Sequence, residues 1–269
     1  MDYNDFLADY NPSDYDRPSV AVDTVVFGIS KTSGDNYRKL DAQQLSVLLV
    51  KRREHPFIDA LALPGGFVAI DEALDAAACR VLHAKAGLQG IYLEQLYTYG
   101  ELERDPRMRI LSSAHVALVD RAQFQSTQLI AAWYNVSLAI SVDNPCLTLN
   151  GDNQQLSIPL KADVHTNGKL QMMRYIADSG YVAFDHAQII VDSLLRLRNK
   201  VDYTDIAFNL VSDEFTISEL QQVYETILGE TLLPAAFRRK IAGKIEETGG
   251  IQQEKGHRPS KLYRYRGNL

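Results

Sequence analysis

The chain has 269 residues, of which 46% are hydrophobic and 23% charged, a composition typical of globular proteins rather than disordered or fibrous ones. No apolar run approaches the roughly 18 residues of a membrane span, and two cysteines, Cys79 and Cys146, are too few for a disulfide scaffold and fit a reducing cytoplasm. The net charge of −6 is unevenly divided, because nine basic and three acidic residues follow Leu233, which predicts a basic module attached to an acidic body.

The N-terminal region alternates strand-like and helix-like patterns. We expect an irregular leader over 1–19 and a hairpin loop over 30–44. Strands are predicted at 20–27, 45–50, 61–63, 91–99, 110–119, 136–142 and about 146–160, and helices at 71–86 and 187–197. The polar segment 198–202 is the best boundary candidate. We therefore predict a larger domain over 20–199 and a smaller module over 200–269.

The segment from Leu61 to Gly87 is the most informative part of the sequence. A strand leads into a Pro64-Gly65-Gly66 turn, and a helix follows with apolar residues at the i, i+3, i+4, i+7 and i+8 positions, namely Leu74, Ala77, Ala78, Val81 and Leu82. Gly66, Glu72 and Arg80 are separated by five and seven residues. This spacing resembles the Nudix box, which predicts an α/β (α+β) fold: a Nudix-like α/β/α sandwich with a mixed sheet.

The box helix lacks the carboxylates that hydrolysis requires. Magnesium is a hard cation that binds carboxylate oxygens, and the Nudix box supplies them as paired glutamates. Ala84 and Lys85 stand at those two positions, and Val81 replaces the glutamate after Arg80. We therefore expect no catalytic residue, no metal site and no required cofactor. Relocated carboxylates remain an alternative: Glu94, Glu101 or Glu103.

A cleft without catalysis can still bind a nucleotide. Arginine suits bidentate phosphate contacts, and aromatic rings can stack on a base. Arg52 follows the strand that ends at Val50, and Arg104 and Arg107 lie between two predicted strands. The predicted effector contacts are Arg52, Gly65, Gly66, Phe67, Arg104 and Arg107. Phe57, Tyr97 and Tyr99 are further candidates for stacking. The alternative is that the loop arginines are only solvated and that the aromatic side chains belong to the hydrophobic core.

The sequence of the C-terminal module predicts a winged helix-turn-helix. Thr216 and Glu219 have the spacing of a capping box that begins a helix, which Gly229 ends. Pro234 begins a second helix, predicted to reach about residue 247 with Phe237, Ile241 and Ile245 on its buried side. A basic hairpin follows over 251–266. The predicted DNA contacts are Arg238, Arg239, Lys240, Lys244, Lys255, His257, Arg258 and Lys261.

A degenerate Nudix box joined to this module resembles the Nudix-related transcriptional regulators of the NrtR family over about residues 20–266. The segments that carry the resemblance are 63–68, 104–107, 181–186, 215–220, 237–240 and 258–263. The resemblance implies a homodimeric, cytoplasmic repressor of genes for NAD biosynthesis or salvage, with operator DNA as partner and ADP-ribose as effector. It also makes Arg52, Arg104 and Arg107 stronger candidates for effector contacts.

Two other functions remain open at this point. An active ADP-ribose pyrophosphatase with a relocated metal site would release phosphate products when magnesium is supplied. An adaptor that uses the hairpin as a docking surface would bind a nucleotide but no DNA.

Overall fold

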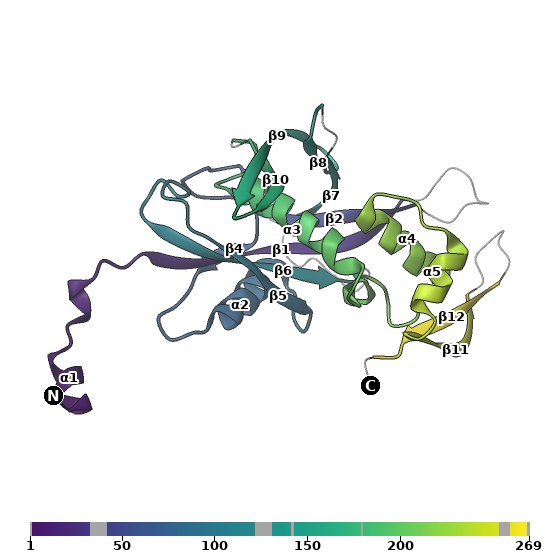
Figure 1. Ribbon diagram of the computed structural model, residues 1–269, viewed down its shortest axis with the longest axis horizontal. Helices are drawn as coiled ribbons and strands as arrows, with labels where there is room; N and C mark the ends of the chain where they lie inside the picture. Colours follow the sequence, from purple (N-terminus) through teal and green to yellow (C-terminus); the bar gives the residue numbers. More distant parts are fainter. Residues whose placement is uncertain are drawn as a thin grey trace.

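The computed structural model describes residues 2–32, 42–121, 131–140, 143–178, 180–252 and 259–267. Its main feature is a mixed sheet crossed by helices and followed by a small helical module with a two-stranded wing (Figure 1). The sheet consists of β1 (Ser19–Thr32), β2 (Ala42–Lys51), β3 (Leu61–Ala62), β4 (Gly65–Phe67), β5 (Tyr92–Tyr99), β6 (Ile110–Val119), β7 (Ala131–Ala139), β8 (Cys146–Asn150), β9 (Gln155–Asn167) and β10 (Leu170–Ala177).

The strand order is β10-β9-β8-β7-β2-β1-β6-β5, with β3 paired to β2 and β4 to β1. Only β1 and β6 are parallel among these pairs, which makes the described sheet mixed. The predicted strand at 110–119 matches β6. The predicted strand over 146–160 is wrong as one element, because the chain turns at Gly151, whose N–H donates to the carbonyl of Gln154, and continues as β9.

The two faces of the sheet are covered by different helices. Val25 and Phe27 of β1 pack into the same cluster as Ile189 of α3 (His186–Val201), whereas Val26 packs with Leu82 of α2 (Leu74–Ala86). Successive side chains of a strand point to opposite faces, so this alternation places one helix on each side. The arrangement is the predicted α/β/α sandwich.

Helix α2 begins three residues later than predicted. The carboxylate of Glu72 accepts a hydrogen bond from the backbone N–H of Ala69 at 2.8 Å, which holds residues 69–72 in a turn before the helix. The expected apolar side is buried from Ala77 to Leu82, while Leu74 is partly exposed. Gly87 ends the helix in the left-handed region, with φ of 68°.

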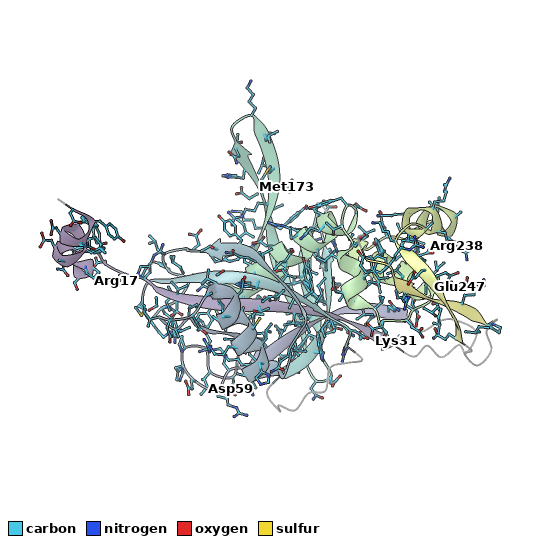
Figure 2. The ribbon with its side chains drawn as sticks, turned by 90° about the horizontal axis from the view of Figure 1, so that it is seen from below. Arg17, Lys31, Asp59, Met173, Arg238 and Glu247 are labelled. Atoms are coloured by element: carbon cyan, nitrogen blue, oxygen red, sulfur yellow. The ribbon has the colours of Figure 1, made fainter. Side chains whose placement is uncertain are left out.

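Two peripheral regions, the leader and the β9–β10 hairpin, differ from what the sequence indicated. The leader contains a short helix, α1 (Tyr3–Asp9), with a capping box between Asp2 and Asp5, and a 3-10 turn η1 (Pro12–Asp14); the expectation of an irregular leader was therefore wrong. Strands β9 and β10 form a hairpin that projects from the body, with Met173 on it (Figure 2). Most side chains of this hairpin are exposed, so its sequence lacks the alternation of apolar and polar residues that predicts a strand.

The C-terminal module contains η3 (Ile206–Leu210), α4 (Ile217–Leu228), α5 (Pro234–Ile241), β11 (Ile245–Gln252) and β12 (Ser260–Tyr265). Thr216 caps α4 in the predicted capping box, and Gly229 ends it with φ of 76°. Helix α5 ends at Ile241 rather than near residue 247. Ile245 is buried as expected, but it begins β11, because the chain turns after α5, where Lys244 N–H donates to Ile241 O.

Helix α3 runs through the segment proposed as a boundary. Its last turn buries Leu197 and Val201, so the polar residues between them lie on an exposed or half-buried side of a continuous helix. Within the described segments, no helix has both the length and the apolar character needed to cross a bilayer.

Candidate effector cavity and nucleic-acid interface

A cavity of about 350 Å³ opens beside the glycine turn. All six predicted effector contacts line it: Arg52, Gly65, Gly66, Phe67, Arg104 and Arg107. The remaining charged residues in its lining are Lys51, Arg53, Lys85, Asp23, Glu54 and Asp105. Basic side chains thus outnumber acidic ones by six to three, so the cavity is suited to an anionic ligand.

A buried polar network forms the floor of the cavity. Asp23 of β1 accepts a hydrogen bond from Ser112 at 2.6 Å, and its carboxylate lies 3.3 Å from Nε2 of His186, at the start of α3. Nδ1 of His186 accepts a hydrogen bond from the N–H of Leu63 at 2.9 Å, so Nε2 carries the proton and faces Asp23. Burial alone would raise the pKa of Asp23, but His186, Ser112 and Arg104 together hold it well below its ordinary value.

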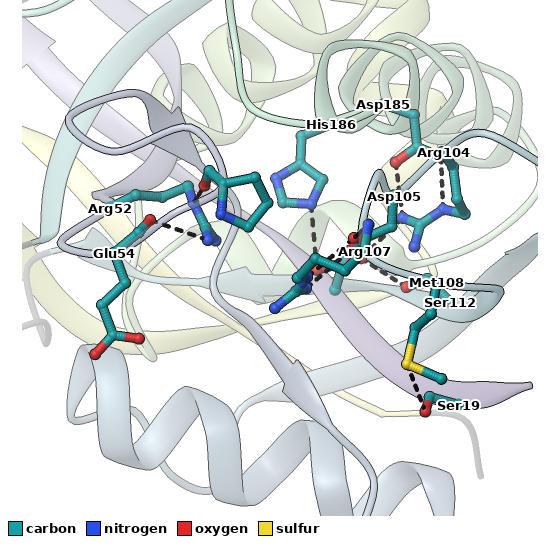
Figure 3. Close-up of polar contacts among 12 residues, drawn as sticks. Ser19, Arg52, Glu54, Arg104, Asp105, Arg107, Met108, Ser112, Asp185 and His186 are labelled. Carbon is teal, nitrogen blue, oxygen red and sulfur yellow. Dashed lines mark hydrogen bonds and ion pairs between the residues drawn. The ribbon is translucent and has the colours of Figure 1, made fainter.

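Arg104 belongs to this floor. Its guanidinium donates to Asp185 at 2.9 and 2.7 Å and to Asp23 at 3.4 Å, and its side chain is only 3% exposed (Figure 3). A guanidinium engaged with two carboxylates mainly fixes the position of α3 against β1. We therefore assign Arg104 a positioning role in the cavity.

Arg52 and Arg107 approach the cavity from its rim. Arg107 forms a two-pronged contact with Asp105, at 2.9 and 2.8 Å, and lies 5.3 Å from the ring of Phe67. Arg52 lies 4.8 Å from the ring of Phe184 and donates to the carbonyl of Pro56. Cation–π contacts of this kind preorganise guanidinium groups while leaving donors available for a phosphate.

Phe184 was not predicted as a site residue. Its φ of 57° lies in the left-handed region, which a bulky residue rarely adopts, and its ring lines the cavity. Among the other aromatic candidates, Phe57 packs edge-on against Phe184, and Tyr99 is buried and donates to Asp192. Tyr97 packs on Tyr99 and does not line the cavity. Phe67 and Phe184 are thus the rings placed to contact a ligand.

The two glycines at the turn lie where the chain packs closely. A Cβ atom at Gly65 would lie 2.0 Å from Oδ1 of Asp23, and one at Gly66 would lie 3.0 Å from Val81 of the box helix. The contact at Gly65 leaves no room for a Cβ atom, and the one at Gly66 would require Val81 to shift, so these glycines let β4 approach β1 and α2. The glycine turn therefore shapes the cavity floor.

The box helix contributes an ammonium group to the cavity. Lys85 lines it, and burial lowers the pKa of Lys85 while the nearby Asp23 opposes that shift. Ala84 is exposed, and Glu72 does not line the cavity. Hydrogen bonds from Arg80 and from the Ala69 N–H lower the pKa of Glu72 to about 2. An ammonium group, an alanine and a carboxylate already bound to Arg80 do not form a divalent metal site. No group of three His, Cys, Asp or Glu within the described segments could hold a metal ion.

The second candidate site is formed by α5 and the wing. Arg238 and Arg239 of α5 are exposed, whereas Phe237 and Ile241 anchor the helix in the core. Arg238 and Lys261 line a shared groove that also includes the start of α4. An isolated β-bridge between Phe215 and Tyr263 joins the wing to the segment just before α4. The helix and the wing thus present basic side chains close together.

The other predicted DNA contacts differ in their surroundings. Lys240 bonds Asp202 at 3.1 Å, and Lys244 bonds Asp205, so both ammonium groups are already paired with acids near the end of α3. Lys261 pairs with Glu247 across the wing. Lys255, His257 and Arg258 lie outside the described residues.

Comparisons with known proteins agree with this arrangement. The family model of the NrtR DNA-binding winged helix domain matches residues 207–265. The ADPR responsive transcriptional repressor NtrR of Acinetobacter baylyi is 32% identical over 270 residues, which span 97% of this chain and 87% of that protein.

Two solved structures share the architecture. The crystal structure of Shewanella oneidensis NrtR complexed with a 27mer DNA is 28% identical, with a TM-score of 0.65 over 92% of this chain and 93% of its own. A MutT/nudix family protein from Enterococcus faecalis has a TM-score of 0.73 at 23% identity, over 99% and 94% of the two chains, and confirms the fold. Similarity to the Acinetobacter repressor over nearly the whole chain places this protein in the NrtR family, as the degenerate box and the winged helix indicated.

Proposed function

We propose that this protein is an ADP-ribose-responsive transcriptional repressor whose sensing domain over 20–199 controls a DNA-binding domain over 200–269. The observation that carries the proposal is the cavity at the glycine turn. It lies at the glycine turn and has a predominantly basic lining, to which the box helix contributes Lys85 rather than a carboxylate. Such a site binds a nucleotide diphosphate without the means to cleave it.

The ligand follows from the chemistry of the lining and from the relative. Arg52, Arg53 and Arg107 supply donors for a diphosphate, and the rings of Phe67 and Phe184 supply surfaces for a base or a ribose. The related Acinetobacter protein is described as ADPR responsive. ADP-ribose, which contains a diphosphate between two ribose units, is therefore the proposed effector.

The DNA-binding role rests on α5 and the wing. Arg239 is the proposed contact to a base edge, because it is exposed on the second helix of the module. Arg238 and Lys261 are placed for phosphates, together with the predicted contacts at the tip of the wing. The related Shewanella protein was crystallised with DNA. A homodimer that reads two half-sites, in control of NAD biosynthesis or salvage genes, completes the proposal.

Three elements connect the cavity to the DNA-binding domain. Strand β1 contributes Asp23 to the cavity and Lys31 to an ion pair with Glu219 of α4, at 2.9 Å. Strand β2 lines the cavity near its C-terminal end, and its Gln43 accepts a hydrogen bond from Thr226 of α4. The third element, α3, begins at the cavity and ends beside α4 (Figure 1). A small displacement at the cavity can therefore change the placement of α4 and α5.

The hydrolase alternative lacks support from the placement of its carboxylates. Glu94 bonds Tyr92 and Lys200, and neither Glu101 nor Glu103 lines the cavity. The test is direct: ADP-ribose is incubated with the protein and Mg²⁺, and the products are separated by chromatography. Intact ADP-ribose, combined with its release of the protein from DNA in a gel-shift assay, supports the repressor, whereas rapid formation of AMP would reject it.

A further inference from the structure

Lys85 lies where the hydrolytic members of this fold need a negative charge. It is in the last turn of α2, thirteen residues after Glu72, and its half-buried side chain lines the cavity. Its surroundings are charged on both sides: Asp23 of the floor attracts the ammonium group, and Arg52 of the rim repels it. The ammonium group is thus held in the cavity rather than in open solvent.

The carboxylates that line the cavity are already engaged or lie at its edge. Asp23 accepts hydrogen bonds from Ser112 and Arg104, and Asp105 holds Arg107. Glu54 is exposed, and its carboxylate points away from His186 and Arg107 (Figure 3). A divalent cation needs several oxygen ligands and the loss of part of its hydration shell. These groups do not offer that set.

A diphosphate nevertheless needs positive charge around it. In metal-dependent sites a divalent cation bridges the phosphate oxygens and neutralises them. An ammonium group is a compact point charge with three donors, and it can reach a phosphate oxygen without coordination geometry. Together with Arg52 and Arg107, which line the same cavity, it would surround the diphosphate with positive charge.

We propose that the Lys85 ammonium group replaces the divalent cation of the fold by binding the ligand's diphosphate directly, so that effector binding requires no metal. This inference rests on the proposed function for the identity of the effector, but the diphosphate contact can be tested without it. It also explains a selective advantage of lysine at this position: the ligand is retained and the cation needed to activate water is kept away.

The experiment uses the full chain and isothermal titration calorimetry with ADP-ribose, in EDTA and in Mg²⁺. Inorganic pyrophosphate, titrated in EDTA, serves as a second probe that contains only the diphosphate. The variants are Lys85→Met, which keeps the length of the side chain without its charge, and Lys85→Arg, which keeps the charge. Lys161→Met on β9, outside the cavity lining, is the matched control, and thermal unfolding checks that each variant is folded.

We expect wild-type affinity for ADP-ribose to agree within about twofold between EDTA and Mg²⁺. Lys85→Met should bind both probes at least about tenfold more weakly, the cost of one charged hydrogen bond, while Lys85→Arg and Lys161→Met remain within about threefold. Wild-type binding that disappears in EDTA and returns with Mg²⁺, or a folded Lys85→Met with unchanged affinity, would overturn the inference.

The second probe separates the two proposals. If pyrophosphate depends on Lys85 as described but ADP-ribose does not bind, the proposed effector is wrong and the diphosphate contact stands. If ADP-ribose binds but only with Mg²⁺, the effector stands and the role of Lys85 is wrong. If neither probe binds, the proposed effector and the proposed role of Lys85 are both wrong.

Discussion

Nε2 of His186 lies 3.3 Å from Oδ1 of Asp23, and this contact joins the first turn of α3 to β1 at the floor of the cavity. The same two elements reach the DNA-binding domain at their other ends. From Asp23 to Lys31, β1 spans roughly 26 Å at about 3.3 Å per residue, and from His186 to Arg198, α3 spans roughly 18 Å at about 1.5 Å per residue. A ligand that changes the floor therefore acts on two rigid connections at once.

Replacing Asp23 tests the importance of the floor for stability. Asp23→Asn removes a buried charge and leaves His186 and Arg104 without their shared partner, which should lower the free energy of unfolding by about 3 kcal/mol at pH 7. Urea denaturation measures this loss. Ser137→Ala on β7, an exposed residue, is the control and should change stability by less than about 0.5 kcal/mol.

We also expect the stability difference between wild type and Asp23→Asn to depend on pH. Because the pKa of Asp23 is lower in the folded protein than its ordinary value of 3.8, ionisation of this group stabilises the fold at pH values above that value. The stabilisation is lost as the pH falls towards the folded pKa. The difference between wild type and Asp23→Asn should be largest above about pH 4 and shrink below it; a constant difference down to pH 2 would contradict the assignment.

Arg198 offers a test of the connection between the domains. Its side chain donates to the carbonyl of Ile227 in α4 at 3.1 Å and to that of Leu138 in β7 at 3.0 Å. We expect Arg198→Met to bind ADP-ribose with nearly wild-type affinity, while the effect of ADP-ribose on DNA affinity falls by about fivefold or more. Arg196→Met, an exposed site on the same helix, should leave the effect intact. If ADP-ribose changes DNA affinity equally in the Arg198→Met and Arg196→Met proteins, the Arg198 contact has no role in the connection.

Replacing Glu72 tests whether this carboxylate has a structural role or binds a metal ion. Arg80 and the Ala69 N–H lower its pKa to about 2, so the carboxylate stays charged and bound to Arg80 throughout pH 5–8. Glu72→Gln should therefore change ADP-ribose affinity by less than about threefold. Loss of a metal ligand would cost far more, on the order of 10- to 100-fold. Calorimetry at pH 7 with Mg²⁺ present decides between these outcomes.

The sequence indicated some residues of the cavity and not others, for physical reasons. The glycine turn and the arginines near it were predicted because close backbone approach and phosphate binding demand particular residue types; they line the cavity, and their contacts with an effector stay predictions. Asp23 and His186 were missed because they are 163 residues apart and only the sheet brings them together. Asp23 had one local signal, a lone carboxylate within an apolar strand. Phe184 lies in the segment 181–186 that carries the family resemblance, but its place in the cavity depends on an unusual backbone conformation that the sequence does not indicate.

The same reasoning explains the errors in the C-terminal module. Phe237, Ile241 and Ile245 have helical spacing, and all three are buried, yet Ile245 belongs to β11. A buried position at the end of a helix can be filled equally well from the following strand, so periodicity alone does not locate the end. Lys244 was predicted as a DNA contact on that helix, whereas the turn after Ile241 directs it to Asp205.

The DNA-binding surface can be tested by separating base contacts from phosphate contacts. Arg239→Ala should weaken binding to DNA selected by the protein from a random library by at least about tenfold, with less effect on unrelated DNA. Lys261→Ala should instead weaken both and reduce the slope of log affinity against log salt by about one. Lys169→Ala, between β9 and β10, is the control. An Arg239→Ala protein that binds the selected DNA like wild type would show that α5 does not read the bases in this way.

The central claim is that the cavity senses ADP-ribose without cleaving it and thereby controls DNA binding. Fluorescence anisotropy of the selected DNA, measured during titration with ADP-ribose and followed by chromatography of the nucleotide, tests both parts in one sample. We expect the anisotropy to fall to that of free DNA while ADP-ribose is recovered unchanged. Anisotropy that stays constant at saturating ADP-ribose, or AMP in the recovered nucleotide, would contradict the account.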